Sequence, residues 1–165
     1  MADDDTAAPP LSDLAPIELQ PIGVVRSTRE EAVDDDWDGE TSSIELLAPF
    51  DERALLGLDA FSHCLVVYAF HRASWDPSRM ARHPRGNPDW PEVGIFAQRA
   101  KDRPNRLGVT TCRVVDVDAT TLRVSGLDAI DGTPVLDIKP HMAEFGPRGE
   151  VAQPAWATEL MTGYW

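Results

Sequence analysis

The 165-residue sequence contains little of what several large protein classes require. No apolar run approaches the length of about 20 residues that a membrane-spanning helix takes, so we expect no membrane association. The first ten residues, MADDDTAAPP, have neither a basic region nor an apolar stretch and do not resemble a secretory signal. The G-x-G-x-x-G fingerprint of dinucleotide-binding folds is also absent.

Cysteine is scarce as well. The two cysteines, Cys64 and Cys112, lie inside strand-like runs, which favours buried free thiols over a disulfide framework or a zinc site. Free thiols indicate a reducing compartment, so we expect a cytoplasmic protein. A cluster of carboxylates at Asp34–Asp38 lacks a histidine or a second acidic cluster, so no metal is expected there. Trp37 within that cluster is expected to cover a pocket.

Basic residues are outnumbered by acidic ones. Lys and Arg total 15 against 28 Asp and Glu, a net charge of −13. Residues 71–106 reverse this balance, with seven arginines and one lysine against four acids, a net of +4. Such a segment can bind phosphate although the chain as a whole repels nucleic acid. The alternative for the acidic remainder is a surface that only keeps the protein soluble.

The length and the apolar content of 42% indicate one globular domain with a real core. Residues 1–15 are rich in Asp, Ala and Pro and are expected to form a disordered acidic tail. We place the domain at residues 16–145. Residues 146–165 are expected to form an extension with a short helix, in which Trp156, Leu160 and Met161 share one face.

Short β-rich runs separated by turn residues predict an all-β fold, a small single-domain β-barrel of about six or seven strands with one or two short helices. Asp51 is expected to cap a helix at residues 52–56 that Gly57 ends. The nearly continuous apolar run Cys64–Phe70 predicts a strand buried on both faces. Residues 74–91, with four prolines, are expected to form a long loop. The remaining strands are expected within residues 17–27, 43–47, 93–97, 109–117 and 121–125.

Two polar loops flank the last two of these strands. Arg99–Gly108 precedes them and Asp128–Pro134 follows them, and Asp116–Thr120 can turn the chain between them. An antiparallel hairpin therefore brings the two loops to the same end, where binding residues commonly gather. The alternative is that neither loop binds a ligand: Asp128–Pro134 would then serve only to turn the chain, and Arg99–Gly108 would be a solvated surface loop.

These loops carry a family resemblance. R-x-x-x-R-P-N-x-x-G at 99–108, followed by G-L-D-x-x-D-G-T-P-V-x-D-I-K-P at 126–140, resembles the TrmO (YaeB, TsaA-like) family of S-adenosylmethionine-dependent methyltransferases, in a short form without the C-terminal domain of longer members. The resemblance extends upstream through residues 22–27, 47–63 and 66–71, so it covers most of the chain. It implies a compact barrel, a homodimer and S-adenosylmethionine bound near the subunit interface.

The resemblance also implies cofactor-binding residues: Phe70, His71, Arg99, Arg103, Asn105, Leu107, Asp131, Gly132 and Thr133. The planar guanidinium groups of Arg99 and Arg103 suit a carboxylate or phosphate. Asp131 or Asp137 is expected to accept from an ammonium or an exocyclic amine, unless Asp137 is paired with a buried Lys139. For His71, a strand-end histidine bonded to the backbone is the alternative. No catalytic residue is assigned, because methyl transfer from a sulfonium depends mainly on alignment.

The expected function is S-adenosylmethionine-dependent N6-methylation of threonylcarbamoyl-adenosine next to the anticodon of tRNA, with the tRNA held by residues 71–106. Gln98, Ala100 and Arg106 depart from the more familiar family pattern beside the site, which bears on substrate choice. Two alternatives stay open: a methyltransferase on the same scaffold acting on a small molecule, and a non-catalytic module that binds S-adenosylmethionine.

Overall fold

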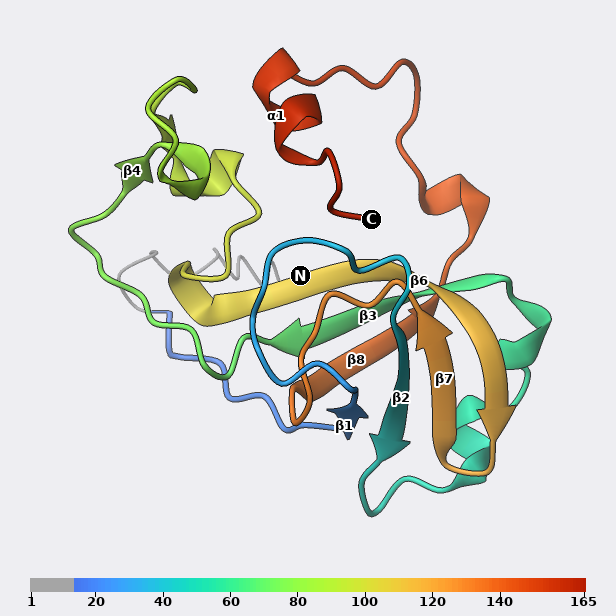
Figure 1. The fold of residues 1–165 in the computed structure, drawn as a ribbon. Coiled ribbons are helices and arrows are strands. Elements are labelled where there is room, and N and C mark those ends of the chain that lie inside the picture. Colours follow the sequence, from blue (N-terminus) through green and yellow to red (C-terminus); the bar gives the residue numbers. More distant parts are fainter. Residues whose placement is uncertain (1–13) are drawn as a thin grey trace, which may run out of the picture.

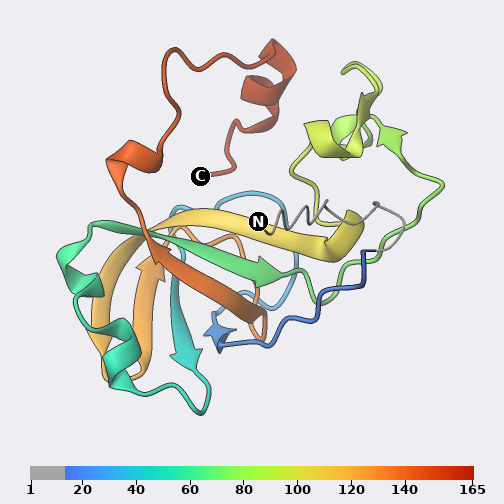
Figure 2. The same cartoon turned by 180° about the vertical axis from the view of Figure 1, so that it is seen from behind.

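Six antiparallel strands form a closed barrel in the computed structural model, which describes residues 14–165 (Figures 1 and 2). The order around the barrel is β1-β2-β7-β6-β3-β8. The predicted small all-β barrel is therefore confirmed. The expected acidic tail at residues 1–15 lies almost wholly outside the described residues. The strands are β1 (Gly23–Arg26), β2 (Thr41–Leu46), β3 (His63–Ala69), β6 (Leu107–Asp118), β7 (Thr121–Ser125) and β8 (Pro134–Pro140).

The core fills the barrel interior because each strand alternates its side chains across the sheet. Val25, Ile44, Val66, Leu122 and Val135 are fully buried there. Cys64 and Cys112 are free, fully buried and directly opposite each other on β3 and β6. Burial raises the pKa of Cys64 to about 11, so its thiol stays protonated near neutral pH.

The expected hairpin is present, and its register joins Val114 to Val124 and Asp118 to Thr121. β7 has the expected bounds, and β6 extends beyond residues 109–117 on both sides. β8, which the sequence analysis did not single out, pairs with both β1 and β3 and so closes the barrel.

Two strand expectations are wrong in part. In β3, only Cys64, Val66 and Tyr68 are buried, and the residues between them are not. β3 belongs to an antiparallel barrel with a single interior, so its outer face is not covered as in a parallel sheet. Only the first two residues of the strand expected at 93–97 are extended, as β5 (Val93–Gly94). The Ile95 amide donates to the carbonyl of Met80, and Gln98 then closes a 3₁₀ turn on Ile95.

Helical structure is short throughout. The Asp51 cap is confirmed, since its carboxylate accepts from the Arg53 amide at 3.0 Å, and Gly57 follows with a φ of +83°. The α-helix α1 (Ala155–Leu160) lies in the extension. No helix in the described part of the chain is long and apolar enough to cross a membrane. The 3₁₀ helices are η2 (Glu52–Leu55), η3 (Leu58–Ala60), η4 (Pro84–Gly86), η5 (Ile95–Ala97), η6 (Pro104–Arg106) and η7 (Ala143–Phe145).

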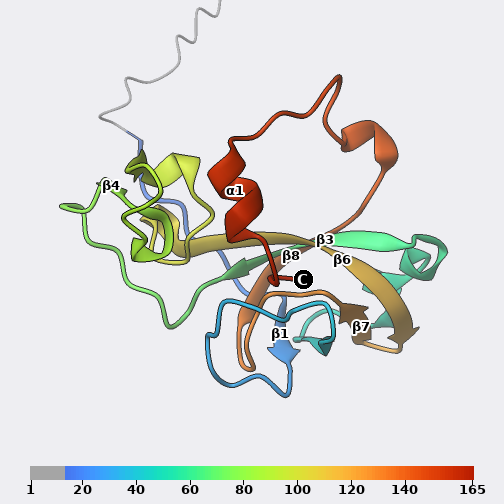
Figure 3. The ribbon, with the colours of Figure 1, turned by 45° about the horizontal axis from the view of Figure 1, so that its top comes forward.

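Residues 71–106 and 153–165, here called the cap, lie together on one side of the barrel (Figures 1 and 3). The loop expected at residues 74–91 contains β4 (Ala81–Arg82), which pairs with β5 in a two-stranded sheet. α1 lies on the same side as this sheet in both views. The cap thus brings the basic segment and the C-terminal segment over one face of the barrel.

Candidate ligand cavity

A cavity of about 1030 Å³ lies between the barrel and the cap. Its volume is at the upper end of the roughly 300–1,000 Å³ of small-molecule and cofactor sites. Apolar rings and charged groups both face it, as expected of a site that orients a polar ligand. The lining comes from residues 32–37, 68–73, 79–86, 92–102, 128–133 and 153–165.

A smaller groove of about 390 Å³ lies beside η2 and η3. Its lining is apolar except for Asp137. The chemistry therefore points to the large cavity.

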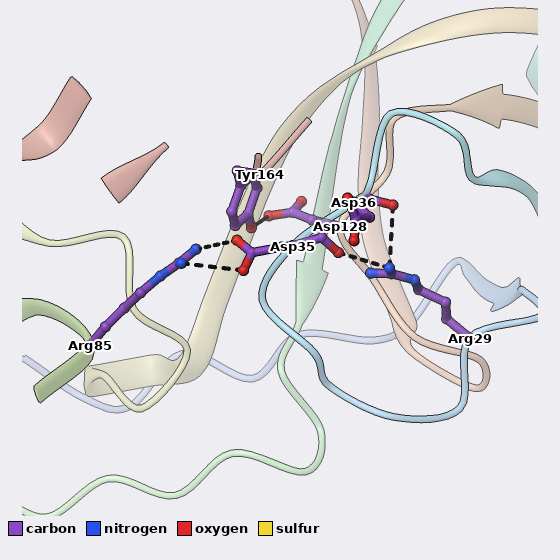
Figure 4. A network of polar contacts seen from close by, with 6 residues as sticks. All are labelled: Arg29, Asp35, Asp36, Arg85, Asp128 and Tyr164. Atoms are coloured by element: carbon purple, nitrogen blue, oxygen red, sulfur yellow. Dashed lines mark hydrogen bonds and ion pairs between the residues drawn. The ribbon is translucent and has the colours of Figure 1, made fainter. Parts of the chain in front are cut away.

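Asp128 is the centre of a polar network in the cavity wall. Its Oδ1 accepts hydrogen bonds from the hydroxyls of Tyr68, at 2.7 Å, and Thr110. Its Oδ2 accepts from the Tyr164 hydroxyl at 2.6 Å (Figure 4). Burial, and next the charge of Asp128, raise the pKa of both tyrosines, so both hydroxyls remain donors at physiological pH. Three chain regions, namely β3, β6 and the C-terminal segment, thus hold one carboxylate at the cavity.

The acidic loop at residues 34–38 forms part of the rim. The Arg29 guanidinium donates to the carbonyls of Asp35 and Asp36 (Figure 4). It also lies 4.2 Å from the ring centroid of Trp37. Trp37 is 4% exposed and lines the cavity, as expected of a residue that covers a pocket. Arg85 of the cap forms an ion pair with Asp35 at 2.7 Å. Within residues 14–165, no three His, Cys, Asp or Glu side chains are grouped to hold a metal ion.

Four of the expected cofactor-binding residues line this cavity. Phe70 packs edge-on against Tyr68, with ring centroids 5.3 Å apart, and Thr133 is buried. Arg99 donates to the Val109 carbonyl and keeps further N–H groups exposed to the cavity. His71 is exposed at the cavity, and partial burial, followed by the charge of Arg72, lowers its pKa.

The other five do not line the cavity. The Asp131 carboxylate accepts from the Ser27 amide, and the Gly132 amide donates to Val25, with a φ of +76° that favours glycine. Arg103 donates to the carbonyl of Gln98 at 2.9 Å. Asn105 is an exposed residue of η6, and Leu107 starts β6. Of these five, Asp131, Gly132 and Arg103 form hydrogen bonds that help to hold the two loops in place.

A buried ion pair between Lys139 and Asp137 was the alternative to a site role for Asp137, and it is correct except for the burial. The two side chains pair at 2.6 Å, but they are 65% and 45% exposed. Both lie on β8, where side chains also reach the outer surface of the barrel. The pair is a surface contact and leaves Asp137 without a role in the large cavity.

Several basic residues of segment 71–106 line the cavity, but some are occupied. Arg82 donates to the carbonyl of Asp102, Arg72 to that of Glu30, and Arg85 pairs with Asp35. Arg79 and Lys101 also line the cavity, and within residues 14–165 neither forms an ion pair. Fewer basic side chains of this segment are therefore available to contact phosphate than the number of its basic residues suggests.

Sequence reasoning missed Tyr68, Asp128 and Tyr164. Asp128 lies in the second polar loop, but the family resemblance pointed to Asp131 in that loop and not to Asp128. The alternation of β3, once its single buried face is known, points Tyr68 inward. Nothing near Tyr164 in the sequence signals its contact with a carboxylate 36 residues away.

A closed antiparallel barrel whose loops and cap enclose a cavity with charged and apolar lining residues defines a ligand-binding barrel. Residues 34–146 match the tRNA-methyltransferase O N-terminal domain. The chain therefore belongs to the TrmO family, as its loop motifs indicated.

Relatives agree with this assignment. The chain is 33% identical to tRNA (adenine(37)-N6)-methyltransferase of Escherichia coli, covering 92% of this chain and 70% of that one. It is 45% identical over 104 residues to the putative S-adenosylmethionine-dependent methyltransferase RcsF of Pseudomonas aeruginosa, covering 61% of this chain and 44% of that one. The chain spans about half the length of the Pseudomonas relatives. The crystal structure of TrmO from Pseudomonas aeruginosa aligns with a TM-score of 0.69 at 32% identity, covering 84% of this chain and 61% of that one.

Proposed function

We propose that the protein is an S-adenosylmethionine-dependent methyltransferase that modifies the N6 atom of an adenine in tRNA. The observation that carries this proposal is the cavity between barrel and cap, which both family loops line. The Escherichia coli relative, named as a tRNA (adenine(37)-N6)-methyltransferase, supports the tRNA adenine. As the finer proposal, the acceptor is the threonylcarbamoyl-adenosine next to the anticodon.

The side chains around the cavity fit the proposed cofactor. Arg99 offers a planar set of donors for a carboxylate, and Asp128 offers an acceptor for an ammonium. Phe70 and Trp37 place aromatic rings at the cavity against which a base can lie. When bound, the cofactor supplies a methyl group already activated on a sulfonium.

The chain's own contribution is therefore orientation. The barrel loops hold their side chains through backbone contacts, and the cap limits the access of water. Holding two reactants in line can supply about 7–11 kcal/mol of the barrier.

The proposal is tested by supplying S-adenosylmethionine and tRNA from a strain that lacks its own enzyme of this family. Mass spectrometry of the digested nucleosides should show methylated threonylcarbamoyl-adenosine. Methylation of an adenosine that lacks the threonylcarbamoyl group would support a tRNA adenine as the acceptor but contradict threonylcarbamoyl-adenosine. Neither product, in a preparation that binds S-adenosylhomocysteine, would contradict a tRNA acceptor.

One observation favours a second candidate, methylation of a small molecule. The Asp35–Arg85 ion pair neutralises a cation at the rim, and the chain carries a net charge of −13. Both features weaken attraction to a phosphate backbone. A compound library screened for methyl transfer would identify such an acceptor.

The homodimer, the cytoplasmic location and the division into residues 1–15, 16–145 and 146–165 remain predictions. Light scattering of the purified protein measures the first of these directly.

A further inference from the structure

The C-terminal segment belongs to the cavity although it lies beyond the family match, which ends at residue 146. Eight residues between Gln153 and Trp165 contribute to the lining. Two backbone hydrogen bonds attach the segment to the acidic loop, from Asp36 to Gly163 at 3.0 Å and from Trp37 to Tyr164 at 2.9 Å. The Trp90 indole also donates to Glu159 of α1 at 2.9 Å. The segment is thus attached both to the acidic loop and to residues 71–106, the other part of the cap.

Asp128 is an unusual carboxylate in this cavity. A carboxylate has about four acceptor positions, and three hydroxyl donors occupy three of them here. No Lys or Arg within residues 14–165 forms an ion pair with it. Its negative charge is therefore held by neutral donors, and one acceptor position is left for a group that enters the cavity.

Tyr164 differs from the other two donors. Tyr68 and Thr110 are buried in the barrel wall, at 1% and 4% exposed, and approach the same oxygen, Oδ1. Tyr164 alone holds Oδ2 and reaches it from the C-terminal segment (Figure 4). Two oxygens bound from different sides fix the plane of the carboxylate. Without Tyr164, the group is held at one oxygen only.

We propose that Asp128 binds an N–H or ammonium group of the cavity ligand and that Tyr164 is the positioning residue that fixes the carboxylate for this contact. The inference rests on the proposed function, which places the methyl donor in this cavity. Two sources can supply such a group: the α-ammonium of the methyl donor and the amine of the methyl acceptor. The C-terminal segment, by this account, completes the ligand site.

The two sources are separated by two probes in calorimetry. S-adenosylhomocysteine carries the α-ammonium, and 5′-methylthioadenosine has the same nucleoside without the amino-acid part. If Asp128 binds the α-ammonium, Asp128→Asn weakens the first probe by about 10-fold or more, and Tyr164→Phe weakens it by about 3- to 10-fold. Neither substitution then changes the affinity for 5′-methylthioadenosine.

If Asp128 binds the acceptor amine, both probes keep their affinities in both variants. Single-turnover methyl transfer to the acceptor then slows by similar factors, and the KM for the methyl donor is unchanged. The matched control is Thr158→Val, which removes a hydroxyl from the same segment on an exposed face of α1, where it accepts only from Gln153. It should leave all of these quantities at their wild-type values.

The inference is overturned by either of two results. Wild-type binding and wild-type transfer in Tyr164→Phe would show that Tyr164 positions nothing. Equal loss of affinity for both probes would assign Tyr164 a purely structural role, which melting temperatures of all variants would corroborate. The proposed tRNA reaction fails separately, when wild-type protein binds S-adenosylhomocysteine but modifies no tRNA.

Discussion

The barrel and the cap are stabilised by different interactions. In the barrel, each strand has two hydrogen-bonded neighbours, and Tyr68 is a buried core residue that also lines the cavity. The cap has only the two-residue strands β4 and β5, and side chains bind its backbone: Gln98 donates to the carbonyls of Arg82 and Val93, and His83 contacts that of Trp90. The cooperative barrel therefore supplies a fixed wall, and the cap supplies a wall of lower local stability.

The largest expected effect is a core truncation in the barrel. Leu122 is fully buried on β7, so Leu122→Ala removes packed methyl groups and leaves a cavity. The free energy of unfolding should fall by about 2–5 kcal/mol. Leu56→Ala is the matched control, because Leu56 is 87% exposed, and it should change stability by under about 0.5 kcal/mol. Chemical denaturation measures both, and equal effects would contradict the description of the core.

A second substitution links the barrel to the cavity. A Cβ added at Gly108 would overlap the ring of Tyr68, which must then shift and lose its contact with Asp128. Gly108→Ala should cost about 1–3 kcal/mol and also weaken ligand binding. Gly94→Ala is the control, since nothing lies within 4 Å of its added Cβ and its φ is −62°. Thermal melts of both variants, with and without S-adenosylhomocysteine, measure the two effects. A Gly108→Ala variant with wild-type stability and ligand response would contradict the described packing of Tyr68.

A third substitution addresses the cap alone. Gln98→Ala removes both hydrogen bonds from its amide group and should destabilise the cap by roughly 1–3 kcal/mol. Amide hydrogen exchange should accelerate in residues 79–98 and stay unchanged in the barrel strands. Gln153→Ala removes an exposed contact to Thr158 and serves as the control. Faster exchange throughout the barrel would mean that barrel and cap unfold together.

The smallest expected effect concerns the ion pair between barrel loop and cap. Asp35 and Arg85 are partly exposed, so Asp35→Asn should change stability by only about 0.2–1 kcal/mol. It frees Arg85, however, so the affinity for tRNA should rise at low salt and converge on wild type at high salt. Asp38→Asn is the control, because Asp38 is exposed and forms no ion pair within residues 14–165. An identical rise in tRNA affinity in both variants would mean that the change in net charge, and not the release of Arg85, causes the effect.

The same difference explains what the sequence could predict. Alternation and turn residues predicted the β6–β7 hairpin, because a half-buried barrel strand shows its alternation of apolar and polar residues in its own sequence. They failed at residues 95–97, because the amide of Gln98 donates to the carbonyl of Ile95 and closes a 3₁₀ turn where an extended strand was expected. The contact of Tyr164 with Asp128 joins distant segments through a single hydrogen bond. Local patterns carry no information on such a contact.

Hydrogen exchange with and without saturating S-adenosylhomocysteine tests the central claim most directly, namely that one ligand site is formed by barrel and cap together. The account predicts slower exchange in three separate regions: the loop at residues 128–133 and both parts of the cap, at residues 79–102 and 155–165. β7, which contributes no residue to the cavity lining, should not change. Protection confined to the barrel loops, with both parts of the cap unaffected, would contradict it.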